Sequence, residues 1–192
     1  GYLAFLDPPK HSVREIITSL KNLGIEMKVL TGDNDVITRR ICQDVGFEIK
    51  GVLTGDEIDR LSESEIKEAV EKINIFTRLS PIQKKRVIDA LRLNKHVVGY
   101  LGDGMNDAPA LIAADVGISV NNAVEIARES ADVILLEKNL LVLKEGILEG
   151  RMTFGNIVKY LKMGSSSNFG NMLSFSGAVI FVPFLPMLPI QI

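Results

Sequence analysis

Short apolar runs alternate with helical patterns through residues 1–150, and this alternation restricts the fold more than any other feature of the sequence. Runs such as Val97–Leu101 and Val116–Val120 have the length of buried strands, and the stretches between runs place apolar residues at helical spacing. Strands that alternate with helices are typical of a parallel sheet covered by helices. We therefore expect an α/β domain over residues 1–150. The other expected strands are Leu3–Leu6, Met27–Leu30, Phe76–Leu79 and Val133–Leu136.

Several helix limits can be read from local signals. Ser62 and Glu65 have the spacing of a capping box, and Ser80 and Pro81 supply the N-cap and the first residue of a helix that reaches about Leu93. Glycines that follow helical patterns are typical C′ residues. Gly24 and Gly46 are expected to end helices in this way, and a last helical pattern runs from about Leu140 through Leu161.

The segment Gly102–Leu111 directly follows the expected strand Val97–Leu101 and contains two carboxylates, Asp103 and Asp107. Open α/β sheets bind ligands beyond the carboxyl ends of their strands. Mg²⁺ prefers oxygen ligands and commonly takes one or two carboxylates together with substrate phosphate. We therefore predict a magnesium site with Asp103 and Asp107 as ligands, where Asn106 orients them or bonds the phosphate.

Two more segments complete a phosphate-binding pattern. Thr31, Gly32 and Asp33 follow the strand that ends at Leu30, where a small residue, a hydroxyl and backbone amides could hold a phosphoryl oxygen. Lys84 lies in the first turn of the helix capped by Ser80, and a cation there can neutralise a transferring phosphoryl group. These residues, with Asp103, Asn106 and Asp107, predict phosphoryl-transfer chemistry.

Parts of this pattern are weak by themselves. A second Thr-Gly-Asp triplet, Thr54–Asp56, is followed by Glu57 at capping-box spacing, and we interpret it as a helix start. Lys84 belongs to the run Lys84–Arg86, which by itself is typical of a solvated helix face. The prediction therefore depends mainly on Gly102–Leu111.

Composition excludes some classes of protein. The net charge of −2 argues against a nucleic-acid partner. The single cysteine, Cys42, excludes an intramolecular disulfide framework and is expected to be a small buried apolar group. His11 and His96 lack the spacing of metal ligands. The sequence opens without Met on an apparent strand, so we expect a fragment.

The last thirty residues differ from the rest, because no charged side chain occurs from Met163 to Ile192. About 20 apolar residues span a bilayer core, and Phe169–Ile192 is long enough. We expect a helical stalk at 151–163 and a transmembrane segment at 164–192; a buried helix of a soluble protein is the alternative. Basic residues before this segment would hold that end in the cytoplasm. These residues are Lys144, Arg151, Lys159 and Lys162.

Polar side chains lie in the first half of this apolar segment. Asn168 and Asn171 could coordinate a transported cation, or they could form hydrogen bonds between membrane helices, and both interpretations stay open. Three prolines in the second half, Pro183, Pro186 and Pro189, would interrupt a helix there.

Four of these motifs occur in an order that resembles the P-type cation-transporting ATPases over essentially the whole chain. They are Asp7–Pro9, Thr31–Asp33, Arg78–Lys84 and Gly102–Leu111. The segments Ser165–Met172 and Pro183–Pro189 are similar to the fifth membrane helix of the bacterial magnesium-transporting branch.

The resemblance implies a haloacid-dehalogenase-like, Rossmannoid phosphorylation domain at 1–150. In such pumps ATP phosphorylates an aspartate, and the aspartyl phosphate drives cation transport, here of Mg²⁺. It implies that Asp103 binds the catalytic Mg²⁺ with support from Asp107 and Asn106, that Lys84 contacts the phosphoryl group, and that Thr31 and Asp33 bind and position phosphate.

It also implies partners and a location. The partners are a nucleotide domain, an actuator domain, other membrane helices and membrane lipid. The location is the inner cell membrane, with residues 1–163 in the cytoplasm.

The sequence departs from the family pattern in one respect: the nucleophile string Asp-Lys-Thr-Gly-Thr is absent. We therefore expect that this chain alone does not turn over ATP. In the family, the strand that carries this string lies between the strands that end here at Leu30 and Leu101. Without it, both strands expose unpaired backbone, and we predict marginal stability unless these two strands close up on each other or the missing segment is supplied.

Two other classes of function remain. A soluble phosphatase of the same superfamily would share the lysine and the acidic loop, but it needs an Asp-x-Asp nucleophile near its N-terminus, which we do not find there. A truncated, non-catalytic partner that docks on an intact pump is compatible with the absent nucleophile, and no motif favours it.

Overall fold

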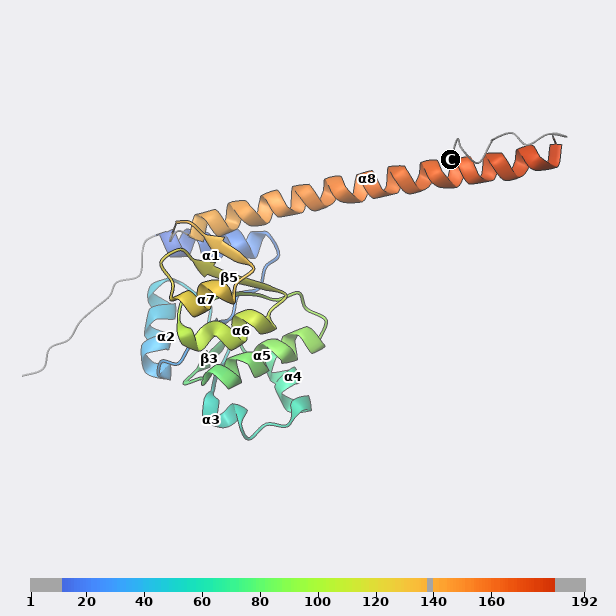
Figure 1. Ribbon diagram of the computed structural model, residues 1–192. Coiled ribbons are helices and arrows are strands. Elements are labelled where there is room, and N and C mark those ends of the chain that lie inside the picture. Colours follow the sequence, from blue (N-terminus) through green and yellow to red (C-terminus); the bar gives the residue numbers. More distant parts are fainter. Residues whose placement is uncertain (1–11, 138–139, 182–192) are drawn as a thin grey trace, which may run out of the picture. The chain divides into compact units, whose positions relative to one another are not determined.

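In the part of the chain that the structure describes, six short strands form two three-stranded sheets, and every strand pairing is parallel (Figure 1). The computed structural model describes residues 12–137 and 140–181, and the chain divides into two units, residues 1–144 and 145–192. The first sheet has the order β1-β3-β2 and the second β4-β5-β6. The strands are β1 (Val29–Leu30), β2 (Val52–Thr54), β3 (Ile75–Thr77), β4 (Gly99–Leu101), β5 (Val116–Val120) and β6 (Val133–Leu135).

Helices follow most strands, as expected for a parallel α/β unit. They are α1 (Ser12–Asn22), α2 (Asp35–Asp44), α3 (Gly55–Ile58), α4 (Glu63–Lys72), α5 (Pro81–Leu93), a 3-10 turn η1 (Met105–Asp107), α6 (Ala108–Ala113) and α7 (Glu125–Glu129). A single helix, α8 (Leu140–Phe181), begins in the first unit and makes up the described part of the second.

Helix α5 joins the two sheets through apolar contacts, because it packs against α4 on one side and α6 on the other (Figure 1). Phe76 of β3 is completely buried in a cluster with α4 and α5. A second cluster centres on Ile88 of α5, and both Leu30 of β1 and Tyr100 of β4 pack against it. This arrangement brings the first turn of α5 close to the loop after β4.

Among the described strands, those that end at Leu30 and Leu101 lie at the edges of separate sheets, since β1 pairs with β3 and β4 pairs with β5. This is the arrangement expected for a phosphorylation domain without its nucleophile strand. The marginal stability that we inferred from it stays a prediction.

Capping and glycine signals located the helix ends that they mark, whereas α8 continues to Phe181, well beyond the expected Leu161. Capping boxes form at Ser62 and Ser80, and Gly24 and Gly46 adopt positive φ just beyond helix ends. Thr54 also caps α3, as expected, but the sequence interpretation missed that Val52–Thr54 is itself a strand. The reason is that this strand is only three residues long and half-buried throughout. The expected strand Leu3–Leu6 lies outside the described residues.

The transmembrane segment expected at 164–192 is not supported by the described part of the chain. Within residues 12–137 and 140–181, no helix combines the length and apolar character needed to cross a bilayer. The physical reason is that α8 is rich in glycine, serine and asparagine after Met163, which dilutes its apolar side chains. The rest of the expected segment, 182–192, lies outside the described residues.

Candidate functional site

An ion pair between Lys84 and Asp107 links the two sheets at the carboxyl ends of their strands. The Nζ atom of Lys84 lies 2.7 Å from Oδ1 of Asp107, and the two side chains are only 10 % and 14 % exposed. Lys84 comes from α5, which follows β3, and Asp107 comes from η1, which follows β4. The two residues that the sequence assigned to phosphate and metal binding therefore meet directly.

The sequence places Lys84 through the cap of α5. The Ser80 hydroxyl accepts the backbone N–H of Gln83, and the Gln83 side chain accepts the backbone N–H of Ser80. Gln83 also donates through Nε2 to Asp59 Oδ2 at 2.6 Å and to the Gly55 carbonyl, so the first turn is fixed on both sides. Lys84 follows at once and is buried, which contradicts the solvated face that its basic neighbours suggested.

The loop after β4 is held by backbone contacts around Gly102. Its N–H donates to the Ile118 carbonyl, and its carbonyl accepts the hydroxyl of the completely buried Ser119 at 2.9 Å. A Cβ at Gly102 would lie 2.6 Å from the Cβ of Asp107. A glycine is therefore required here for Asp107 to reach Lys84.

Three donors bind the carboxylate of Asp107. Oδ1 accepts Lys84 Nζ and the Tyr100 hydroxyl, each at 2.7 Å, and Oδ2 accepts the Gly104 N–H at 3.2 Å. Burial raises the pKa of Asp107, but the hydrogen bonds from Lys84 and Tyr100 outweigh this effect and hold the pKa below its ordinary value. The carboxylate is therefore ionised at neutral pH.

Tyr100 was not identified from the sequence. The pKa of its phenol is raised, first by burial and then by the neighbouring Asp107 carboxylate. The phenol therefore stays protonated and donates a hydrogen bond to Asp107. In the sequence it is an aromatic residue within an apolar run, which suggests a core position. No pattern along the chain indicates its contact with Asp107.

Thr31 and Asp33 form a turn at the end of β1. The Thr31 hydroxyl accepts the Asp33 N–H at 3.0 Å and donates to Asp33 Oδ2 at 2.9 Å. The backbone of this turn bonds to the segment that leads into α5, because Leu79 N–H donates to the Thr31 carbonyl and Arg78 N–H to the Asp33 carbonyl. The Thr-Gly-Asp turn is thus linked through two backbone hydrogen bonds to the two residues that precede the N-cap of α5.

The oxygen-bearing side chains here fit a magnesium ion that takes most of its ligands from bound water and from substrate. Asp103 and Asn106 are exposed beside the Lys84–Asp107 pair, while both oxygens of Asp107 already accept hydrogen bonds. Within residues 12–137 and 140–181, no cluster of three or more His, Cys, Asp or Glu side chains could enclose a metal. Mg²⁺ commonly uses one or two carboxylates, and Asp103 and Asp107 are the two that this loop supplies.

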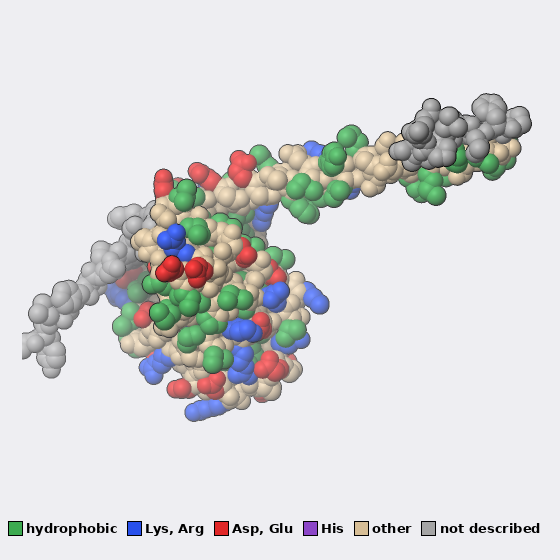
Figure 2. All heavy atoms as spheres, in the orientation of Figure 1, with side chains coloured by type: hydrophobic (Ala, Val, Ile, Leu, Met, Phe, Trp, Pro, Cys, Tyr) green, Lys and Arg blue, Asp and Glu red, His purple; other side chains and the backbone are tan. Residues whose placement is uncertain are grey.

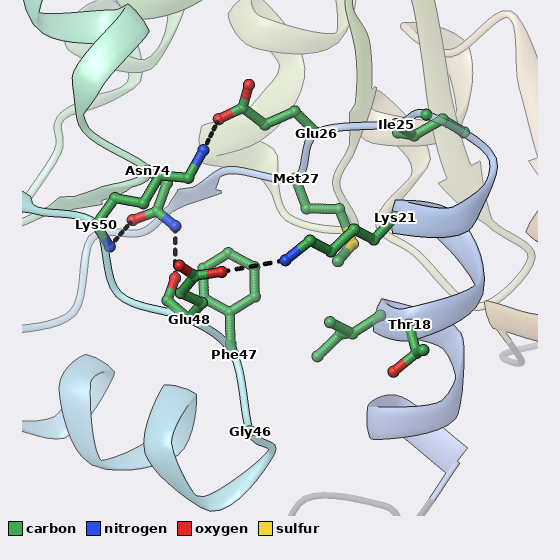
Figure 3. Close-up of a pocket in the computed structure, with 12 residues that line it drawn as sticks. Thr18, Lys21, Ile25, Glu26, Met27, Gly46, Phe47, Glu48, Lys50 and Asn74 are labelled. Atoms are coloured by element: carbon green, nitrogen blue, oxygen red, sulfur yellow. Dashed lines mark hydrogen bonds and ion pairs between the residues drawn. The ribbon is translucent and has the colours of Figure 1, made fainter.

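A cavity of about 530 Å³ lies at the opposite end of the first sheet (Figure 3). Its lining includes Met27 and Phe47, which precede β1 and β2, and Asn74, which precedes β3. The ion pairs Lys21–Glu48 and Lys50–Glu26 cross its rim at 3.2 and 2.8 Å. Because parallel strands share their direction, this cavity is separate from the Lys84–Asp107 site.

The polar residues expected in the apolar segment lie on α8. Asn168 and Asn171 are exposed, and apolar side chains project along this helix (Figure 2).

Cys42 is buried, as expected from the sequence.

The fold and the site define a parallel α/β domain with a buried lysine–aspartate pair at the carboxyl ends of its strands. Residues 1–115, more than half of the chain, match the family model described as haloacid dehalogenase-like hydrolase. The chain belongs to this family.

Similarity to curated proteins extends over the whole chain. It is 56 % identical over 192 residues to the magnesium-transporting ATPase, P-type 1, of Salmonella typhimurium strain LT2, covering 100 % of this chain and 21 % of that protein. Identity to the protein of the same name in Escherichia coli K12 is 51 %, with the same coverage. The chain thus spans about a fifth of the length of these relatives.

A solved structure shares the fold. It describes the catalytic domain of the CPx-ATPase CopB-B, with a TM-score of 0.54, 27 % sequence identity, and coverage of 72 % of this chain and 44 % of that chain. The resemblance to P-type ATPases that the motifs suggested is therefore confirmed by sequence and by structure.

Proposed function

We propose that this chain is the part of an ATP-driven cation pump that surrounds a phosphoryl group with Lys84, the Thr31–Asp33 turn and the acidic loop. The observation that supports this most directly is the buried Lys84–Asp107 pair at the carboxyl ends of the strands. The aspartate that accepts the phosphoryl group would belong to another part of the pump, because the chain lacks the nucleophile string. ATP is the substrate of the complete pump.

Each residue of the site has a defined task in this proposal. Lys84 neutralises negative charge on the phosphoryl group, and Thr31, Gly32 and Asp33 position its oxygens. Asp107 holds Lys84, while Asp103 with Asn106 holds the catalytic Mg²⁺. The bound ion would supply charge neutralisation at the phosphoryl oxygens.

The central test is phosphoenzyme formation in the complete pump. Asp103→Asn, Lys84→Met and Asp33→Asn should each strongly reduce labelling from radioactive ATP in the presence of Mg²⁺. The control is Asp56→Asn, which changes an exposed aspartate in the second Thr-Gly-Asp triplet. Normal labelling in the Asp103 and Lys84 variants would contradict the proposal.

We also propose Mg²⁺ as the transported cation, because relatives that match the full chain at 56 % and 51 % identity carry magnesium-transporting names. Asn168 and Asn171 are candidate ligands. The test is the Mg²⁺-stimulated ATPase activity of the Asn168→Ala and Asn171→Ala pumps. Unchanged stimulation in both variants would show that neither asparagine belongs to the transport site.

In the complete pump, we propose a phosphorylation domain at 1–150, a stalk at 151–163 and a membrane-associated segment at 164–192. The glycines and serines of α8 after Met163 suit close packing against other membrane helices better than an independent span. Cysteines placed in 164–181 should then be protected from a membrane-impermeant thiol reagent. Full labelling of all of them would contradict this part of the proposal.

A phosphatase is the second candidate, and one local feature favours it. Asp33 and Asp35 have Asp-x-Asp spacing directly after β1, which the sequence interpretation did not consider. Asp33 accepts the Thr31 hydroxyl, and Asp35 forms an ion pair with Arg78 at 3.1 Å, so both carboxylates are engaged. Turnover of p-nitrophenyl phosphate by the purified chain, lost in Asp33→Asn, would favour this function over the pump.

A further inference from the structure

One hydroxyl group shares the carboxylate oxygen that binds Lys84. Tyr100 OH and Lys84 Nζ both lie 2.7 Å from Oδ1 of Asp107. The second oxygen, Oδ2, accepts the Gly104 N–H. The ammonium group of Lys84 therefore shares its acceptor atom with a neutral donor.

The fold fixes this hydroxyl in place. Tyr100 lies in the middle of β4, which pairs with β5 in register Tyr100↔Gly117. Its side chain packs against the cluster around Ile88, which belongs to α5, the helix that also carries Lys84. A phenol has only two rotatable torsions between ring and backbone, so the packed ring aims its hydroxyl at Asp107 with little freedom.

We propose that Tyr100 is a positioning residue that weakens the hold of Asp107 on Lys84, so that the ammonium group can turn to an anionic phosphoryl group. This inference rests on the proposed function. The hydroxyl satisfies part of the hydrogen-bonding capacity of Oδ1 whether or not Lys84 stays there. When Lys84 turns away, Asp107 keeps two donors, and the desolvation cost of leaving a buried carboxylate without partners is reduced.

Tyr100→Phe removes only this oxygen. Asp107 should then bind Lys84 more strongly. The complete pump should bind orthovanadate, a phosphate analogue that can become pentacoordinate when bound, about tenfold more weakly, as expected for the loss of one hydrogen bond to a charged group. Tyr160→Phe is the control, because Tyr160 is 70 % exposed on α8. Calorimetric titration with vanadate and Mg²⁺ measures the affinity without turnover.

A second measurement tests the contact itself. The chain has three tyrosines, so 3-fluorotyrosine labelling gives three ¹⁹F resonances that Tyr→Phe variants can assign. Lys84→Met and Asp107→Asn should both shift the Tyr100 resonance and leave that of Tyr160 in place. If the chemical shift of Tyr100 does not change in either variant, the proposal is overturned.

Vanadate affinities of the Tyr100 and Lys84 variants separate the role of Tyr100 from the proposed function. Unchanged vanadate affinity in Tyr100→Phe, together with weak binding in Lys84→Met, would overturn the role of Tyr100 and leave the proposed function standing. Unchanged affinity in Lys84→Met would contradict the proposed function.

Discussion

The ammonium group of Lys84 and the carboxylate of Asp107 meet at 2.7 Å, although they are carried by segments that follow strands of two different sheets. Both side chains are largely buried, so neither group can exchange its partner for bulk water without rearrangement. The pair is therefore a structural connection between the sheets as well as the centre of the candidate site.

Asp107→Ala should destabilise the chain by about 3–5 kcal/mol, because it leaves the ammonium group of Lys84 buried without a counter-ion. Asp107→Asn should cost less, since its amide oxygen can still accept from Tyr100. The control is Asp89→Ala, which breaks the Lys85–Asp89 ion pair on α5. Its two side chains also meet closely, at 2.6 Å, but both are half-exposed, so the loss should cost under about 1 kcal/mol. Urea unfolding followed by circular dichroism measures these differences, and equal costs for Asp107→Ala and Asp89→Ala would contradict a buried pair.

Gly102→Ala should displace Asp107 and destabilise the chain by about 1–3 kcal/mol, because the added methyl group would lie 2.6 Å from the Cβ of Asp107. Gly99→Ala, three residues earlier in β4, is the matched control. A Cβ at Gly99 meets its nearest atom, the Val116 carbonyl oxygen, at 3.8 Å, which is an ordinary contact. Thermal unfolding should separate the two variants, and a Gly102→Ala protein as stable as Gly99→Ala would show that the loop after β4 is not constrained in this way.

Thr77→Val should stabilise the chain by about 1 kcal/mol, although replacing a buried threonine by valine usually does the opposite. Among the described side chains, Thr77 Oγ1 is the one buried nitrogen or oxygen atom without a hydrogen-bond partner, and valine removes this unsatisfied group at nearly constant volume. The buried Thr38 donates to the Asn34 carbonyl at 2.9 Å, so Thr38→Val should destabilise by a similar amount. If both substitutions change the free energy of unfolding in the same direction, the Thr77 hydroxyl has a partner in solution.

The sequence predicted those parts of the fold that depend on residues close together in the chain. The capping boxes at Ser62 and Ser80 formed as expected, because each involves atoms only three residues apart. The strand Val52–Thr54 was missed, because three half-buried residues carry no alternating pattern and gain their pairing from β3, more than twenty residues away.

The candidate site shows the same division. The motifs indicated Lys84 and Asp107, and the structure brings them together. The burial of Lys84 could not be predicted, since Lys85 and Arg86 beside it are typical of a solvated face. Its burial arises where α5 packs against α6 and η1, which lie more than fifteen residues further along the chain. The contribution of Tyr100 depends on the direction of one hydroxyl group across the sheet, which no pattern along the chain encodes.

The cap of α5 should affect the site, whereas the equivalent cap of α4 should not. Ser80→Ala and Ser62→Ala each remove a side-chain acceptor from a capping box, and each should cost about 1 kcal/mol of stability. Lys84 lies in the turn that Ser80 fixes, so Ser80→Ala should also loosen the Lys84 side chain and weaken vanadate binding by the complete pump.

Ser62→Ala should leave the vanadate affinity unchanged, because α4 carries no residue of the site. Calorimetric titration of both variants beside wild type, at a temperature where all three are folded, makes the comparison. Equal affinities in the two variants would mean that the contact with Asp107 is enough to place Lys84, and that the capping box serves only the stability of the helix.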